Sequence, residues 1–281
     1  MKHIATRLQS NWDWRAAGNF VFGAAGGCLL AIAAAASFPA PPPIAVTLAA
    51  LALIGAGLGL VWLELGRPWR ALNVFFHGET SWMTREAIVA GVLFPLALLG
   101  LLAGVPGLVQ AAAVAGLSYA YCQARMLQGA KGIVTWREPA VIPFMVVTAL
   151  AEGSGLLLLA GVLLPPAPAG WLPYLAMLLI LLRSFAWMHY RGRIDAQKAP
   201  LQARTELKRI SPPVLVAGHL APLLLLIAAQ ALPPTAGLLL PLAGLLTVGA
   251  GWVIKARIVI TASYQQGYAF GRLRKGLPDD Y

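Results

Sequence analysis

The chain is poor in charge. Of its 281 residues, only 11% are Asp, Glu, Lys or Arg, whereas 59% are hydrophobic. A soluble domain of this size would carry about twice that charged fraction, so the composition excludes an ordinary soluble protein. Ten acidic residues stand against 21 basic ones, which gives a net charge of +11. An excess of basic residues occurs in proteins that bind nucleic acid and in membrane proteins, where it sets the orientation. The positions of the charges decide between the two.

Cysteine is also scarce. Cys28 and Cys122 are the two cysteines, and each lies inside an apolar run. An iron–sulfur cluster takes four ligands, and a disulfide framework needs several pairs. No Walker or dinucleotide-binding motif is present, and the polar segments are too short for a nucleotide-binding domain. We therefore expect no iron–sulfur cluster in this chain and no soluble catalytic domain.

Long apolar runs are abundant, and they predict an all-α polytopic membrane protein with a single membrane domain, residues 1–281. At about 1.5 Å rise per residue, eight runs are long enough to cross a bilayer. The polar N-terminal segment has no cleavage site, so we expect the first run to be a retained span. The predicted spans are 14–36, 44–65, 85–104, 107–125, 139–164, 170–189, 213–231 and 235–259.

The basic residues are confined to alternate connections. Eight spans would place all 21 Lys and Arg on one side, together with both termini. The positive-inside rule makes that side cytoplasmic, and this placement favours membrane orientation over nucleic-acid binding. Arg183 is grouped with the basic loop at 190–212 on this side. The positive charge of that loop suits contact with either anionic lipid or a soluble partner. Lys255 is expected to snorkel to the interface.

A polar segment joins the second and third runs. Glu64 ends the second run, and Pro68 cannot continue a helix without losing a backbone hydrogen bond. Arg70 and Asn73 lie three residues apart, so a helical turn would place them on one face. Glu64 is then either an interfacial carboxylate paired with a nearby arginine, Arg67 or Arg70, or a proton donor and acceptor beside a redox ligand.

The third run begins just after this segment. Residues 81–86 are typical of a helix start, with Thr84 as the expected N-cap and Glu86 in the first turn. Two carboxylates, Glu64 and Glu86, are thereby predicted at one membrane edge, together with arginine side chains. Charge is expensive there, which favours a functional role.

Three further ionisable residues are candidates. Glu152 is the acidic residue deepest in a span, where it would act as a proton relay or remain neutral and hydrogen bonded near Ser154 or Thr148. His189 and His219 flank the basic loop and could ligate a haem. His219 could instead line a quinone pocket.

A resemblance to one family rests on two segments, Glu64-Leu-Gly-Arg-Pro-Trp-Arg70-Ala-Leu-Asn73 and Ser81-Trp-Met-Thr-Arg85-Glu86. They resemble the signature of the membrane anchor subunits of molybdoenzymes of the dimethyl sulfoxide reductase type. These subunits belong to a wider group that includes the membrane subunit of polysulfide reductase. The eight-span pattern agrees with that family over the whole chain.

The resemblance implies a function without catalysis in this chain. Family members carry no haem, and they exchange electrons between membrane quinone and an iron–sulfur subunit, which relays them to a molybdopterin catalytic subunit. The family's quinone site uses an acidic or imidazole residue before the Leu-Gly-x-Pro turn and a Glu entering the third span, which match Glu64 and Glu86. By the same resemblance, exchangeable quinone is the cofactor, in contact with Glu64 and Glu86, in the bacterial inner membrane. Arg70, Asn73 and His219 are further candidate quinone contacts from their positions in the chain.

Two more segments, 11–20 and 262–270, are similar to the branch assigned to phenylacetyl-CoA:acceptor oxidoreductases. A cytoplasmic catalytic subunit suits a CoA thioester, which cannot leave the cell interior.

Two other functions remain open. A secondary transporter usually shows corresponding interrupted helices in its two halves, and none is evident here. A purely structural anchor would use the charged cluster only to dock its partner.

Overall fold

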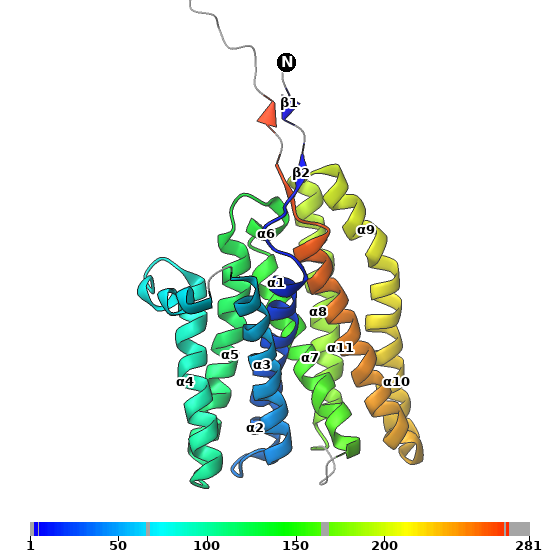
Figure 1. Ribbon diagram of the computed structural model, residues 1–281. Coiled ribbons are helices and arrows are strands. Elements are labelled where there is room, and N and C mark those ends of the chain that lie inside the picture. Colours follow the sequence, from blue (N-terminus) through cyan, green and yellow to red (C-terminus); the bar gives the residue numbers. More distant parts are fainter. Residues whose placement is uncertain (1–2, 5, 66–67, 164–168, 267, 270–281) are drawn as a thin grey trace, which may run out of the picture.

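A computed structural model describes residues 3–4, 6–65, 68–163, 169–266 and 268–269. Nearly all of these residues lie in helices that run side by side as a bundle (Figure 1). The chain is therefore an all-α polytopic membrane protein, as its composition predicts. In the described part of the chain, seven stretches are long and apolar enough to cross a membrane: Trp14–Ser37, Ile44–Glu64, Trp82–Leu102, Val141–Gly161, Leu172–Ala196, Leu201–Ala231 and Pro233–Ile260.

The fourth predicted span corresponds to helix α5, Pro106–Gly129, which is not among these seven stretches. It is 24 residues long, but Gln110, Ser118 and Gln123 make it more polar than its neighbours. Its length suits a membrane span of about 30 Å. The eighth crossing therefore stays a prediction.

The prediction of a loop at 190–212 is wrong, because most of these residues are helical. Helix α8 runs over Leu172–Ala196 and α9 over Leu201–Leu215, so only residues 197–200 separate them. The intervening Arg, Gln, Leu, Glu and Lys residues are good helix formers, and hydropathy alone cannot detect a polar helix. Pro212 and Pro213 lie inside α9, and the π-helical segment η3, Val216–Leu220, follows before α10, Ala221–Ala231.

The first membrane stretch lies near the centre of the bundle. It consists of α1, Trp14–Gly18, the π-helical η1, Asn19–Gly23, and α2, Ala24–Ser37, and it is the most enclosed of the seven. Helix α2 packs against α3, Ile44–Glu64, against α5, and against α7, Val141–Leu163. A Cβ atom on Gly27 would lie 2.5 Å from the backbone oxygen of Gly116, so the small residues allow α2 and α5 to touch.

The remaining helices surround this centre. Helix α4, Trp82–Leu102, packs mainly on α5, whereas α7 packs on α8 and on α11, Ala236–Ile260. A Cβ atom on Gly155 of α7 would lie 2.9 Å from the backbone oxygen of Gly244 of α11, so these two helices also pack closely. The short elements are the 3₁₀ helices η2, Pro68–Phe76, and η4, Pro233–Thr235, and the single-turn helix α6, Val134–Arg137.

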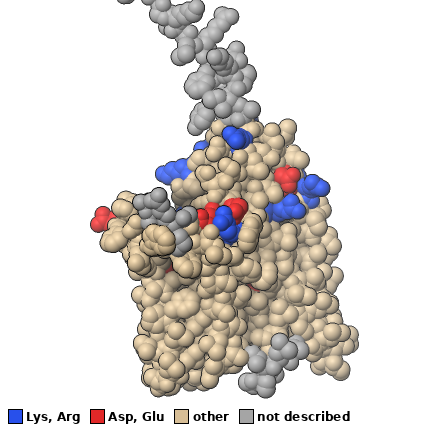
Figure 2. All heavy atoms as spheres, viewed as in Figure 1, with Lys and Arg blue, Asp and Glu red and all other residues tan. Residues whose placement is uncertain are grey.

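Both ends of the described chain lie at one end of the bundle. Strand β1, His3–Ile4, pairs with β4, Tyr268–Ala269, and β2, Arg7–Leu8, pairs with β3, Tyr264–Gln265. Strand β1 projects beyond the helices, whereas β2 lies level with the end of α9 (Figure 1). On the face drawn in Figure 2, the charged side chains gather at this same end of the molecule, and the lower part of that face is almost entirely uncharged.

Candidate functional site

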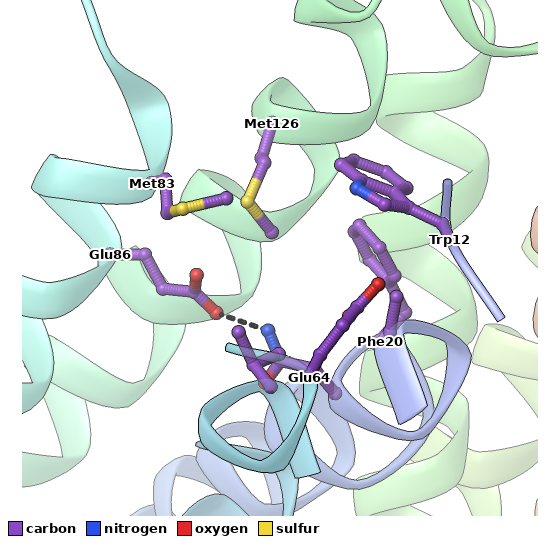
Figure 3. Close-up of a pocket in the computed structure, with 9 residues that line it drawn as sticks. Trp12, Phe20, Glu64, Met83, Glu86 and Met126 are labelled. Carbon is purple, nitrogen blue, oxygen red and sulfur yellow. Dashed lines mark hydrogen bonds between the residues drawn. The ribbon is translucent and has the colours of Figure 1, made fainter. Parts of the chain in front are cut away.

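A small cavity opens near the charged end of the bundle (Figure 3). Four segments form it: the start of the chain with α1 and η1, the end of α3, the start of α4, and the end of α5. Its volume is about 40 Å³, which is room for a few water molecules. A larger ligand therefore requires the lining side chains to move. The lining residues are Trp12, Ala16, Asn19, Phe20, Val61, Glu64, Met83, Glu86 and Met126.

Glu86 is the buried acidic group of this cavity, with 3% of its surface exposed. Its Oε1 accepts hydrogen bonds from Asn19 Nδ2 at 3.0 Å and from Gln123 Nε2 at 2.8 Å. Tyr119 donates in turn to Asn19 Oδ1 at 3.3 Å. The other carboxyl oxygen of Glu86 points toward Met83 and Met126 (Figure 3). One oxygen is thus fixed by amide donors, and the other is available to a ligand.

The charge balance of Glu86 is unusual. Its hydrogen-bonding partners are all neutral, and among the described residues no cation forms an ion pair with it. An unpaired carboxylate is costly away from water. A carboxyl group in this setting is suited to exchange a proton with a ligand whose own charge changes.

The start of α4 differs from its prediction. Ser81, not Thr84, is the N-cap, because Ser81 Oγ accepts from the Thr84 backbone N–H at 3.3 Å. The helix begins at Trp82, so Glu86 lies beyond the first turn and faces inward. Arg85 turns the other way and donates to the Gly78 backbone oxygen at 2.9 Å. Two adjacent residues of α4 thus place an acid toward the bundle interior and a base toward the outside.

Glu64 ends α3 and lines the same cavity, where its side chain is partly exposed. Arg15 reaches the residue before it, because Arg15 Nη1 donates to the Leu63 backbone oxygen at 2.8 Å. Arg15 also forms a 2.9 Å ion pair with Asp13. Hydrogen bonds from Arg15 lower the pKa of the Asp13 carboxyl below its usual value. Arg15 therefore couples the N-terminal segment to the C-terminal end of α3.

The predicted arginine partners of Glu64 are not part of this geometry. Arg67 lies outside the described residues, and the Arg70 side chain does too. The backbone of Arg70 and the whole of Asn73 lie in η2, a 3₁₀ helix in which residues three apart do share a face. Asn73 is exposed and is not among the residues lining the cavity. Quinone contact by Arg70 and Asn73 stays a prediction.

Aromatic rings close the cavity on the N-terminal side. Trp12 stacks on Trp136 of α6, with ring centroids 4.8 Å apart, and lies 5.6 Å from Phe20. The Trp136 indole donates to the Ile258 backbone oxygen at 2.9 Å. Trp14, by contrast, is 63% exposed. Of the two tryptophans, Trp14 therefore suits an interfacial belt, whereas Trp12 offers a flat apolar wall.

Glu152 and His219 lie in a second buried cluster, and neither lines the cavity. Glu152 pairs with Lys255 at 2.5 Å, and both side chains are fully buried. The expectation that Lys255 snorkels is therefore wrong. The prediction that Arg183 belongs to the basic loop is also wrong. Arg183 is fully buried within α8, and it donates to His219 at 3.2 Å. A carboxylate and other buried acceptors hold these cations inside.

Sequence reasoning missed the groups that hold the acids. Two signals in the sequence could have identified these residues. Asn19 belongs to a segment that resembles the family, and Gln123 is an amide inside an apolar run. Glu138 was missed as well. It is 2% exposed and pairs with Arg193 at 3.2 Å, which ties the start of α7 to the end of α8.

No protein-family model matches the chain, and no curated protein matches it either. The fold and the site together define its class as a multi-pass helical membrane protein with buried acidic residues.

Proposed function

We propose that this chain is the membrane anchor and quinone-reactive subunit of a molybdopterin and iron–sulfur oxidoreductase in the bacterial inner membrane. It exchanges electrons between membrane quinone and an iron–sulfur partner, and it carries no haem or iron–sulfur cluster of its own. The resemblance of the segment at 64–86 to such anchors is one support. The cavity beside Glu86 is the observation that carries the proposal.

The chemistry of quinone explains why such a cavity would need carboxyl groups. Reduction of a quinone to a quinol takes up protons together with electrons, and the reverse reaction releases them. Glu86 is buried beside neutral donors and presents one oxygen to the cavity, so we assign it the proton exchange with the ligand. Glu64 is partly exposed at the charged end, and we assign it the exchange with water.

We further propose eight spans with both termini cytoplasmic. The pairing of β1 with β4 and of β2 with β3 supports an even number of crossings, because it brings both ends of the chain together. Adding α5 to the seven apolar stretches gives that even number. The basic residues at this end favour the cytoplasmic side.

The partners follow from the same orientation. We propose that an iron–sulfur subunit docks at the basic end and connects to a molybdopterin catalytic subunit in the cytoplasm. Phenylacetyl-CoA is the substrate that the resemblance of segments 11–20 and 262–270 suggests for that catalytic subunit. A CoA thioester is available in the cytoplasm, which agrees with this side of the membrane.

Purification in mild detergent tests the proposal. We expect the chain to co-purify with subunits that contain iron and molybdenum, and the complex to oxidise or reduce an added short-chain quinone. Isolation of the chain with no metal-containing partner and no quinone-dependent redox activity would overturn it. Vesicles that hold the chain and take up a solute down an ion gradient would support a transporter instead.

A further inference from the structure

Two arginine side chains meet at one tryptophan where α4 begins and α5 ends. The guanidinium carbon of Arg85 lies 4.2 Å from the centroid of the Trp82 ring, and that of Arg125 lies 4.5 Å from the same centroid. The ring of Tyr121 meets the Trp82 ring edge to face, with centroids 5.7 Å apart, and its own centroid lies 5.9 Å from the Arg125 guanidinium carbon. Two aromatic rings therefore hold two like charges close together.

No carboxylate balances these charges in the described part of the chain. The ion pairs among the described residues join other side chains, and neither Arg85 nor Arg125 takes part in one. Arg85 donates to the backbone oxygens of Gly78 and Glu79, at 2.9 and 2.8 Å. Those oxygens and the aromatic rings attract a cation but carry no net charge. Two adjacent cations without a counter-charge are unfavourable at the edge of a bilayer, where the dielectric constant is lower than in water.

The side chains at this place also lack an acceptor. Arg125 Nη1 donates to the Tyr121 hydroxyl at 3.1 Å, and in the described part of the structure Arg125 Nε is buried without a hydrogen-bond partner. The Tyr121 hydroxyl accepts from Arg125, so its own proton is free for another acceptor. A phosphate group carries negative charge and several acceptor oxygens, and guanidinium groups bind it strongly. The missing group therefore has the chemistry of a phosphate.

The helix faces that continue from the two arginines are apolar and exposed. On α4, Ile88 and Val92 follow Arg85 by three and seven positions and share its side of the helix. On α5, Leu117 and Val114 lie eight and eleven positions before the other arginine and share that side. All four apolar side chains are at least 43% exposed. Helix α4 lies at the edge of the bundle (Figure 1) and packs on α5, so these faces suit contact with acyl chains.

We propose that α4 and α5 form a binding site for one anionic phospholipid. The phosphate lies beside Trp82 against Arg85 and Arg125 and accepts a hydrogen bond from Tyr121, and the acyl chains lie along the exposed apolar faces below. A free phosphate ion would supply the negative charge but would leave those faces uncovered. None of these four side chains lines the cavity beside Glu86, and the inference does not depend on the proposed function.

Native mass spectrometry of the full-length protein in mild detergent tests the ligand. We expect one molecule of added dioleoylphosphatidylglycerol to bind each chain. Dioleoylphosphatidylcholine should bind about tenfold more weakly or worse, because its choline group is repelled by the two guanidinium groups. Equal affinity for the two lipids would overturn the proposal. Inorganic phosphate should not displace dioleoylphosphatidylglycerol, and displacement would identify a site for a free anion instead of a lipid.

Paired substitutions test the residues. Arg85→Gln combined with Arg125→Gln should weaken phosphatidylglycerol binding by about tenfold or more, because it removes two charge-assisted contacts. Arg209→Gln combined with Arg257→Gln removes the same charge at exposed positions of α9 and α11 and should change the affinity by less than about twofold. Equal losses in the two double variants would show general attraction to positive charge and would overturn the assignment of this site.

A second pair keeps the charge and changes only its shape. Arg85→Lys combined with Arg125→Lys retains both cations, but lysine neither stacks flat on an indole ring nor offers two parallel donors to a phosphate. A bound lipid stabilises the folded state, so dioleoylphosphatidylglycerol should raise the melting temperature of wild type more than that of this variant. An equal rise in both proteins would contradict the stacked arrangement at Trp82.

Discussion

Gln123 of α5 donates a 2.8 Å hydrogen bond to Glu86 of α4, although the two residues are 37 positions apart. The same Gln123 amide also donates to the Asn19 backbone oxygen at 3.0 Å. One amide thus ties α4 and α5 to the π-helical segment η1. A π-helical segment leaves backbone carbonyls outside the regular ladder, and Asn19 lies where η1 begins.

The other π-helical segment, η3, plays the same part in the second cluster. It contains His219, and the backbone oxygen of its Gly218 accepts from Arg183. Each π-helical segment that the structure describes therefore contributes to one buried polar cluster. This agrees with the frequent occurrence of such segments at functional sites.

Glu86→Gln should lower quinone-coupled turnover by about 10²-fold or more, the usual scale for losing a proton-transfer group. The amide keeps the size of the side chain but cannot carry the proton. Turnover with a short-chain quinone, measured on the assembled complex, checks this. Glu79→Gln makes the same change at an exposed position and should leave turnover unaltered. Turnover within about twofold of wild type in Glu86→Gln would reduce Glu86 to a structural role.

Glu64→Gln should also slow turnover, by about tenfold to 10²-fold. Glu64 is partly exposed, so water can replace part of its function, and its loss should be milder than that of Glu86. Rates measured over a pH series for both variants test the division of roles. A larger loss in Glu64→Gln than in Glu86→Gln would reverse the assignment.

Gln123→Leu should destabilise the protein by about 1–3 kcal/mol, because it leaves Glu86 with one fewer donor in a buried site. Thermal unfolding in detergent measures the change. The double variant Gln123→Leu with Glu86→Leu removes the carboxyl group that lost its donor and should recover part of the lost stability, although Asn19 then lacks both of its bonds to these side chains. No recovery in the double variant would mean that the hydrogen bond is not the cause.

Gly27→Val should prevent close contact of α2 with α5 and destabilise the bundle by about 1–3 kcal/mol or more. The reason is the 2.5 Å approach of its Cβ position to the Gly116 backbone oxygen. Gly59→Val is the matched control, since nothing described lies within 4 Å of its Cβ position. Similar unfolding temperatures for the two variants would contradict the packing argument.

Topology can be tested with a reporter that is active only outside the cytoplasm. A fusion after Asp280 should be silent, and an insertion within 165–169 should be active, because the basic residues mark the cytoplasmic side. Both positions lie outside or at the edge of the described residues. An active fusion after Asp280 would reverse the orientation and remove the argument for a cytoplasmic catalytic partner.

The sequence by itself determined the class of the protein and the region of its candidate site. Long apolar runs and Pro-rich breaks are local properties, so they predicted most helix positions within a few residues. Ends set by polar helix formers were not predictable in this way, and α8 continues to Ala196, past its predicted end at 189. Hydropathy reports the apolar part of a helix and says nothing of where the polar part stops.

Only the tertiary structure decided which polar groups meet. Lys255 near the end of an apolar run could reach the interface or a buried partner, and its local sequence is the same in both cases. The structure brings it to Glu152, 103 positions away. A polar group inside an apolar bundle needs a partner, so the sequence implies that Glu86 and Glu152 have partners. The identity of each partner depends on helix packing, which is set by contacts among residues far apart in the chain.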